Sequence, residues 1–175
     1  MYTIRTDYRD ETVIEKSRFI CTLKKVSSET EAQDFIKVVK KEFWDATHNC
    51  SAYIIDELAQ RSSDDGEPSG TAGLPMLEVL RKNQLSGVAA VVTRYFGGIK
   101  LGAGGLVRAY TGSVSKAVQS CGLARKILMG TFALSADAAD AGKLLNIIYQ
   151  QQLFTVASVE YGQQARILLL SLIHI

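Results

Sequence analysis

A continuous apolar run, Val88-Ala89-Ala90-Val91-Val92, constrains the fold of this chain more than any other feature. A strand with one face in solvent alternates apolar and polar residues, whereas an unbroken apolar strand needs cover on both faces. We therefore predict a central strand here, with other elements packed on each side. The chain has 175 residues, of which 47% are apolar and 22% charged, enough for a folded core in one domain or two small ones.

The flanking sequence carries helix and strand signals of its own. Ser28 and Glu31 have the spacing of a capping box, and apolar residues then recur at helical spacing, which predicts a helix from Ser28 to about Phe43. The pattern restarts after Gly122, which indicates a second domain. The other predicted elements are strands over 50–55, 127–134 and 153–161, helices over 74–82 and from the glycine-rich turn to Cys121, and a helix capped by Asp137.

Charge is unevenly distributed along the chain, although the net charge is only +2. That total excludes a strongly polyelectrolyte protein, so any affinity for anions must be local. The segment from Val79 to Ala136 contains no acidic residue, and its bases must find distant carboxylates, solvent or an anionic ligand. Those eight bases are Arg81, Lys82, Arg94, Lys100, Arg108, Lys116, Arg125 and Lys126.

The cysteines and the start of the chain indicate a reducing, cytoplasmic setting. Cys21, Cys50 and Cys121 are odd in number and widely spaced, which disfavours a disulfide scaffold or a CxxC zinc site. The opening MYTIRTDYRDE has no apolar run, so we expect neither a signal peptide nor a membrane span.

The turn after the central strand is rich in glycine and flanked by bases. Glycines at a strand-to-helix turn let several N–H groups converge on an anion at the start of the helix. The P-loop and GxGxxG patterns do not match, because Ala103, Gly104 and Val107 occupy their key positions. Two interpretations stay open: tight packing of helix on strand, with Arg94 buried against a carboxylate of 64–67, or an anion site. The predicted anion-binding residues are Arg94, Gly97, Gly98, Lys100, Gly102, Gly104, Gly105 and Arg108.

A second group of candidates precedes the central strand. His48 and Cys50, two apart on a strand, would face the same side about 6.6 Å apart, as a nucleophile and base or two metal ligands would. The only other histidine is His174, so we predict no metal and no cofactor. The acidic loop offers oxygen ligands without the spacing of a calcium loop, and we expect it to be solvated and to cap the next helix through Thr71. The candidate ligand-lining residues are His48, Cys50, Asp64, Asp65, Glu67, Ser69 and Thr71.

Four segments together resemble the YigZ/IMPACT family of cytosolic proteins. The resemblance extends over 1–122 and continues beyond. The segments are Glu15-Lys16-Ser17-Arg18-Phe19, Ala46-Thr47-His48-Asn49-Cys50-Ser51-Ala52-Tyr53, Asp64-Asp65-Gly66-Glu67-Pro68-Ser69-Gly70-Thr71-Ala72-Gly73 and Arg94-Tyr95-Phe96-Gly97-Gly98-Ile99-Lys100-Leu101-Gly102.

The resemblance implies an α+β fold in two domains. Residues 1–123 would form an IMPACT-type N-terminal domain of the ribosomal protein S5 domain 2-like class. Residues 124–175 would form a ferredoxin-like domain, of which this sequence supplies only βαββ. We therefore expect a truncated second domain, with either a truncated chain or a foreign tail at about 171–175.

For function, the resemblance implies regulation of translation. Eukaryotic relatives compete for the activator of an initiation-factor kinase through an additional N-terminal domain, so that partner is not carried over to this chain. The bacterial fold relationships imply RNA or ribosome contact, and the family supplies no established catalytic residue. We predict a non-enzymatic, translation-associated protein that binds RNA, the ribosome or another phosphate-bearing ligand at the turn. The alternatives are an enzyme acting on a phosphorylated small molecule and a protein-interaction module.

Overall fold

The protein is described by a computed structural model, which covers residues 1–127 and 129–172. The chain divides into two compact units, Met1–Lys126 and Ile127–Ile175, and each is described by itself. The two units mix helices with antiparallel sheets, which agrees with a mixed α and β class. The predicted truncated or foreign tail falls mostly on 173–175, outside the described residues. No helix in the described ranges is both long and apolar enough to cross a membrane.

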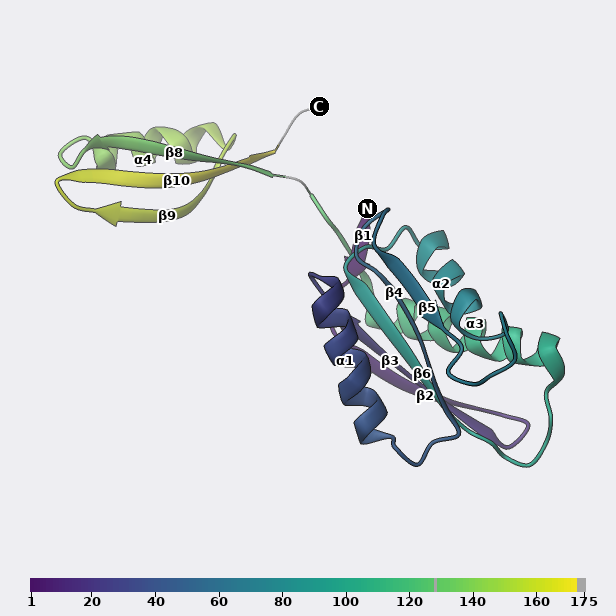
Figure 1. The fold of residues 1–175 in the computed structure, drawn as a ribbon. Helices are drawn as coiled ribbons and strands as arrows, with labels where there is room; N and C mark the ends of the chain where they lie inside the picture. Colours follow the sequence, from purple (N-terminus) through teal and green to yellow (C-terminus); the bar gives the residue numbers. More distant parts are fainter. Residues whose placement is uncertain (128, 173–175) are drawn as a thin grey trace. The chain divides into compact units, whose positions relative to one another are not determined.

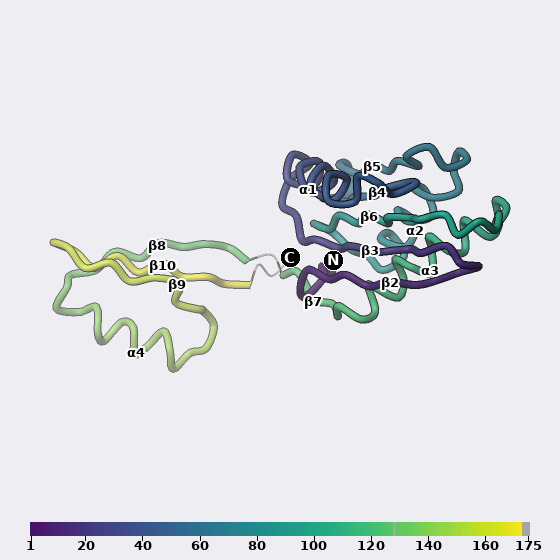
Figure 2. Tube along the Cα trace, turned by 90° about the horizontal axis from the view of Figure 1, so that it is seen from below, coloured from purple at the N-terminus to yellow at the C-terminus, as the bar shows by residue number. Residues whose placement is uncertain are grey.

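Unit 1 is built on a five-stranded sheet with the order β2-β3-β6-β4-β5, in which every neighbouring pair is antiparallel. The predicted central strand is confirmed, because β6 lies in the middle and its residues 88–92 are fully buried. Figure 2 shows the five strands in this order. The strands are β2 (Tyr8–Ile14), β3 (Ser17–Lys25), β4 (His48–Ile54), β5 (Gln60–Ser63) and β6 (Val88–Tyr95).

Helices cover both faces of this sheet, which explains why residues 88–92 of β6 are apolar on both sides (Figure 1). Helix α1 (Glu29–Glu42) buries Phe35 and Val39 on one face. Helices α2 (Gly73–Lys82) and α3 (Gly102–Cys121) cover the other face with a larger core that includes Leu80 and Tyr110. A short ribbon of β1 (Tyr2–Ile4) and β7 (Leu123–Arg125) completes unit 1.

The predicted helix start at Ser28 is confirmed, whereas two other predicted caps are wrong. The Ser28 hydroxyl accepts a hydrogen bond from the Glu31 N–H at 3.2 Å, and the Phe43 N–H closes the last turn of α1. Thr71 instead donates to the Pro68 carbonyl at 2.6 Å, and the N–H groups at the start of α2 are taken by Asp64. Helix α4 begins after Asp140 rather than Asp137 and has no side-chain cap.

Unit 2 is a three-stranded antiparallel sheet with one helix. The strand order is β8-β10-β9, and α4 lies along one face (Figure 2). Its small core is formed by Ile148 of α4 with Ile167 and Leu169 of β10. The elements are β8 (Met129–Asp137), α4 (Ala141–Gln151), β9 (Thr155–Tyr161) and β10 (Gln164–Leu172).

Candidate functional site

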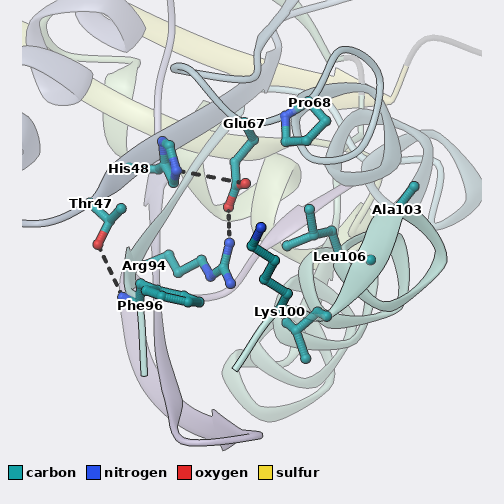
Figure 3. A pocket seen from close by; sticks show the side chains of 11 residues that line it. Thr47, His48, Glu67, Pro68, Arg94, Phe96, Lys100, Ala103 and Leu106 are labelled. Carbon is teal, nitrogen blue, oxygen red and sulfur yellow. Dashed lines mark hydrogen bonds and ion pairs between the residues drawn. The ribbon is translucent and has the colours of Figure 1, made fainter. Parts of the chain in front are cut away.

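A pocket of about 390 Å³ lies where β6 ends and α3 begins, against the loop that precedes α2. Figure 3 shows the Glu67 carboxylate on its wall, with His48 on one side and Arg94 reaching toward it from the other. The lining residues are Thr47, His48, Glu67, Pro68, Arg94, Phe96, Lys100, Leu101, Gly102, Ala103 and Leu106.

A buried charge pair forms the polar wall of this pocket. Arg94 and Glu67 are only 5% and 7% exposed, and the Arg94 Nη1 donates to Glu67 Oε1 at 2.7 Å. The Tyr110 hydroxyl donates to the same oxygen at 2.8 Å, and burial raises the pKa of that phenol, which keeps it a donor. The guanidinium also lies 5.5 Å from the ring centroids of Phe19 and Phe96. The charge of Arg94 is therefore already balanced inside the protein.

Three atoms of the polar wall still have hydrogen-bonding capacity. Within the described ranges, the buried Nε of Arg94 has no partner. Glu67 Oε2 is 3.7 Å from His48 Nε2, beyond hydrogen-bond distance. His48 Nδ1 lies 2.9 Å from the carbonyl oxygen of Asp65, which can only accept, so Nδ1 carries the proton. The His48 ring therefore turns its Nε2 toward Glu67.

The glycines of the turn allow a close backbone contact and positive φ angles that other residues would disfavour. A Cβ on Gly97 would lie 2.0 Å from the backbone carbonyl of Lys16, so only glycine lets these two segments meet. Gly98 and Gly102 have φ of +88° and +68°, a region that side chains disfavour. Gly104 and Gly105 form the first turn of α3, which has no side-chain cap and no acidic residue.

Of the three bases predicted at the turn, Arg94 has a carboxylate partner and the other two have none among the described residues. Among residues 1–127 and 129–172, neither Lys100 nor Arg108 forms an ion pair. Lys100 lines the main pocket, and both bases line a neighbouring hollow beside Gly105. Glu15 also lines that hollow, so two positive side chains and one negative side chain lie around it.

The prediction that the acidic loop is solvated is wrong for its carboxylates at 64, 65 and 67, because hydrogen bonds within the protein organise them. Asp64 accepts from the backbone N–H groups of Gly70, Ala72 and Gly73 at 2.7–3.1 Å. Burial alone would raise the pKa of Asp64, but these three donors outweigh it and hold the pKa below its usual value. Asp65 is paired with Lys40 and accepts from the Asn49 N–H at 2.7 Å. Both carboxylates therefore fasten the loop that carries Glu67.

Cys50 lies behind the pocket and does not line it. Its thiol donates to the Asp64 carbonyl at 2.9 Å and contacts the Tyr110 hydroxyl. Burial raises the pKa of Cys50 to about 12, so the thiolate form that a nucleophile needs is scarce. In the part of the chain that the structure describes, no three His, Cys, Asp or Glu side chains gather as a metal site would.

Comparisons with known proteins identify the family of the chain that carries this pocket. Residues 15–118 match the family described as Impact N-terminal domain, and this range contains every residue of the pocket. The chain is 53% identical over 164 residues to IMPACT family member YvyE of Bacillus subtilis (strain 168), covering 93% of this chain and 75% of that protein. The chain belongs to the IMPACT family.

Two further relatives extend the comparison. IMPACT family member YigZ of Escherichia coli (strain K12) is 39% identical over 152 residues, covering 78% of this chain and 74% of YigZ. The crystal structure of a hypothetical protein aligns with a TM-score of 0.70 and 32% identity, over 97% of this chain and 84% of that one. The predicted YigZ/IMPACT membership is thus confirmed.

The structure brings together only part of the predicted site. His48, Glu67, Arg94, Lys100 and Gly102 line one pocket. Ser69 is exposed and, like Thr71, lies outside that lining. Sequence reasoning missed Phe96 and Leu106 as pocket walls and Tyr110 as a donor to Glu67. The helical spacing of Tyr110 identifies a core position, but no signal in the sequence shows a hydroxyl partner that lies 43 residues away.

Proposed function

We propose that this IMPACT family protein is a non-enzymatic, translation-associated protein of the cytoplasm that binds RNA at the turn between β6 and α3. Lys100 and Arg108 are its main phosphate contacts in this proposal. The observation that carries it is that these two bases flank the uncapped start of α3 without a carboxylate partner among the described residues.

Physical chemistry supports a phosphate at this position. The first N–H groups of a helix have no intrahelical partner, and the helix dipole favours negative charge beside them. Two other bases of the acid-free segment are occupied, because Arg81 pairs with Glu78 and Lys116 with Asp10. Arg94 in this proposal shapes the pocket through Glu67 and does not act as the salt-dependent phosphate contact.

The resemblance to the YigZ/IMPACT family supplies the link to translation, with RNA alone or RNA within the ribosome as partner. We also propose the finer fold assignment: a ribosomal protein S5 domain 2-like domain over 1–123 and a partial ferredoxin-like domain over 124–175. The order β8-β10-β9 with one helix supports the second assignment, because it is that of a βαββ unit.

The test is RNA affinity measured across a salt series. Each phosphate neutralised contributes just under one unit to the slope of log affinity against log salt, so Lys100→Ala with Arg108→Ala should weaken binding and flatten the slope by about 1 to 2 units. Lys82→Ala with Arg125→Ala is the matched control, because it also removes one lysine and one arginine from exposed positions. An unchanged slope, or an equal loss in the control, would overturn the proposal.

A further inference from the structure

We infer that the pocket beside the turn holds an unpaired nucleobase that presents N–H donors to Glu67, and that guanine fits it best. This inference rests on the proposed RNA binding and names the part of the RNA that the pocket takes.

The apolar walls of the pocket favour a flat, largely apolar group over a phosphate. Pro68, Leu101, Ala103 and Leu106 line the pocket together with the ring of Phe96. Phe96 is 46% exposed although it is large and apolar, and its N–H is held by the Thr47 hydroxyl at 3.0 Å. Proteins bind single-stranded nucleic acid by stacking bases on such aromatic rings beside basic side chains.

The Glu67 carboxylate on the polar wall of the pocket can accept further hydrogen bonds. Arg94 and Tyr110 both donate to Glu67 Oε1, which leaves Oε2 without a donor among the described residues. The nearest side-chain nitrogen on that side, His48 Nε2, is 3.7 Å away, so both lone pairs of Oε2 are open to a ligand. A ligand that places two adjacent N–H groups at Oε2 satisfies both of these lone pairs.

Among the bases, guanine offers this pattern most fully. Its N1–H and N2 amino group are adjacent donors on one edge, whereas uracil has a single N–H between two carbonyl oxygens that the carboxylate would repel. Adenine and cytosine place one amino group beside an acceptor nitrogen. The donor edge of guanine is hidden in a Watson–Crick pair, so the base must be unpaired.

Lys100 links the base pocket to the phosphate contacts. It lines both the pocket and the hollow that contains Arg108. A base in the pocket would therefore place the phosphates of its own strand near the two free bases at the start of α3. The pocket supplies base preference, and the two bases supply salt-dependent affinity.

The test compares short single-stranded RNAs by fluorescence anisotropy: an all-uridine oligomer, the same oligomer with one central guanosine, and one with inosine, which lacks the N2 amino group. We expect the guanosine oligomer to bind about tenfold more tightly than the uridine oligomer, with inosine between them. Placing the guanosine in a duplex should abolish the preference. Equal affinity for all three single strands would overturn the inference.

Two variants assign the preference to the pocket. Phe96→Leu keeps an apolar side chain at an exposed position but removes the stacking surface, and it should lose most of the preference. Val107→Ala, an exposed apolar position on α3 outside this pocket, is the matched control and should keep it. Glu67→Gln should also lose the preference, with its melting curve measured because Glu67 is buried.

The outcomes separate the inference from the proposed function. Salt-dependent binding of every oligomer, weakened by Lys100→Ala with Arg108→Ala but without base preference, leaves the proposed function standing and overturns the base pocket. If no RNA binds, both are overturned. A preference for guanosine that Phe96→Leu and Val107→Ala reduce equally would also contradict the assignment to this pocket.

Discussion

The two units differ in how completely their sheets are covered, and the difference separates a unit that can bury charge from one that cannot. In unit 1, helices on both faces enclose the Arg94–Glu67 pair. In unit 2, Phe132 and Leu134 of β8 lie opposite the buried Leu169 and Ile167 of β10 and share their face, yet are 55% and 36% exposed. Helix α4 therefore covers only part of that face.

The size of the core sets what each unit can stabilise. A buried ion pair costs several kcal/mol of desolvation per ion, which its own attraction and hydrogen bonds repay only in part. A unit that holds such a pair therefore depends on the apolar burial in the rest of its core. The described residues of unit 2 bury no charged side chain, and their core is apolar throughout. We therefore expect unit 2 to be the less stable part of the chain.

The largest effect is expected for Arg94→Ala, which leaves the Glu67 carboxylate buried without its partner. We expect unit 1 to lose about 3 to 5 kcal/mol of stability, seen as faster hydrogen exchange throughout unit 1 with unit 2 unchanged. Arg81→Ala, which removes an exposed pair with Glu78, is the control and should cost under about 1 kcal/mol. A similarly small cost for Arg94→Ala would show that the pair is not structural.

A smaller effect is expected for Ile167→Ala, which creates a cavity in the core of unit 2. The loss should be about 3 kcal/mol, enough to bring exchange in unit 2 close to that of an unfolded chain. Exchange in unit 1 should not change, because the substitution lies in a separate core. Ile147→Ala, at a half-exposed position on α4, serves as the control. Faster exchange in unit 1 would break the distinction between the units.

The smallest of these effects is expected for Asp64→Asn, which weakens the anchor of the Glu67 loop by about 2 kcal/mol. Because the pKa of Asp64 is lower in the folded protein than its usual 3.8, its contribution is fully present above that value. It is lost as the pH falls through the lower folded pKa. Urea unfolding of both proteins at about pH 6 and about pH 3 measures this. The exposed Asp34→Asn is the control. If the difference in unfolding free energy between the two proteins were larger at the lower pH, the expected direction of the pH dependence would be wrong.

Local features of the fold were predictable from the sequence because local forces decide them. The apolar run at 88–92 identified a central strand, and the Ser28 and Glu31 spacing identified the start of α1. Caps supplied from a distance were not predictable. Asp64 accepts a hydrogen bond from the N–H of Gly73, nine residues further along the chain. Sequence spacing favours a nearby cap, and it therefore pointed wrongly to Thr71.

The candidate site was predictable only as a set of separate motifs. Lys100 and Arg108 could be identified as free bases near a helix start because no acid lies near them in sequence. Arg94 belongs to the same acid-free segment, but its partner Glu67 is 27 residues away. The two meet because β6 pairs with β4, to which Asp65 fastens the loop that carries Glu67. The pocket itself depends on packing that brings Phe96 and Leu106 to the same cavity. The spacing of apolar residues in the sequence does not show which side chains meet in this way.

The most direct test of the account is a hydrogen-exchange footprint of the whole chain with and without single-stranded RNA. We expect RNA to slow exchange at the turn over 95–108, where the bases without carboxylate partners meet the start of α3, and to leave 129–172 unchanged. Lys100→Ala with Arg108→Ala should remove that protection. Protection confined to 129–172, with the turn unchanged, would contradict the account, because it would place RNA binding on unit 2.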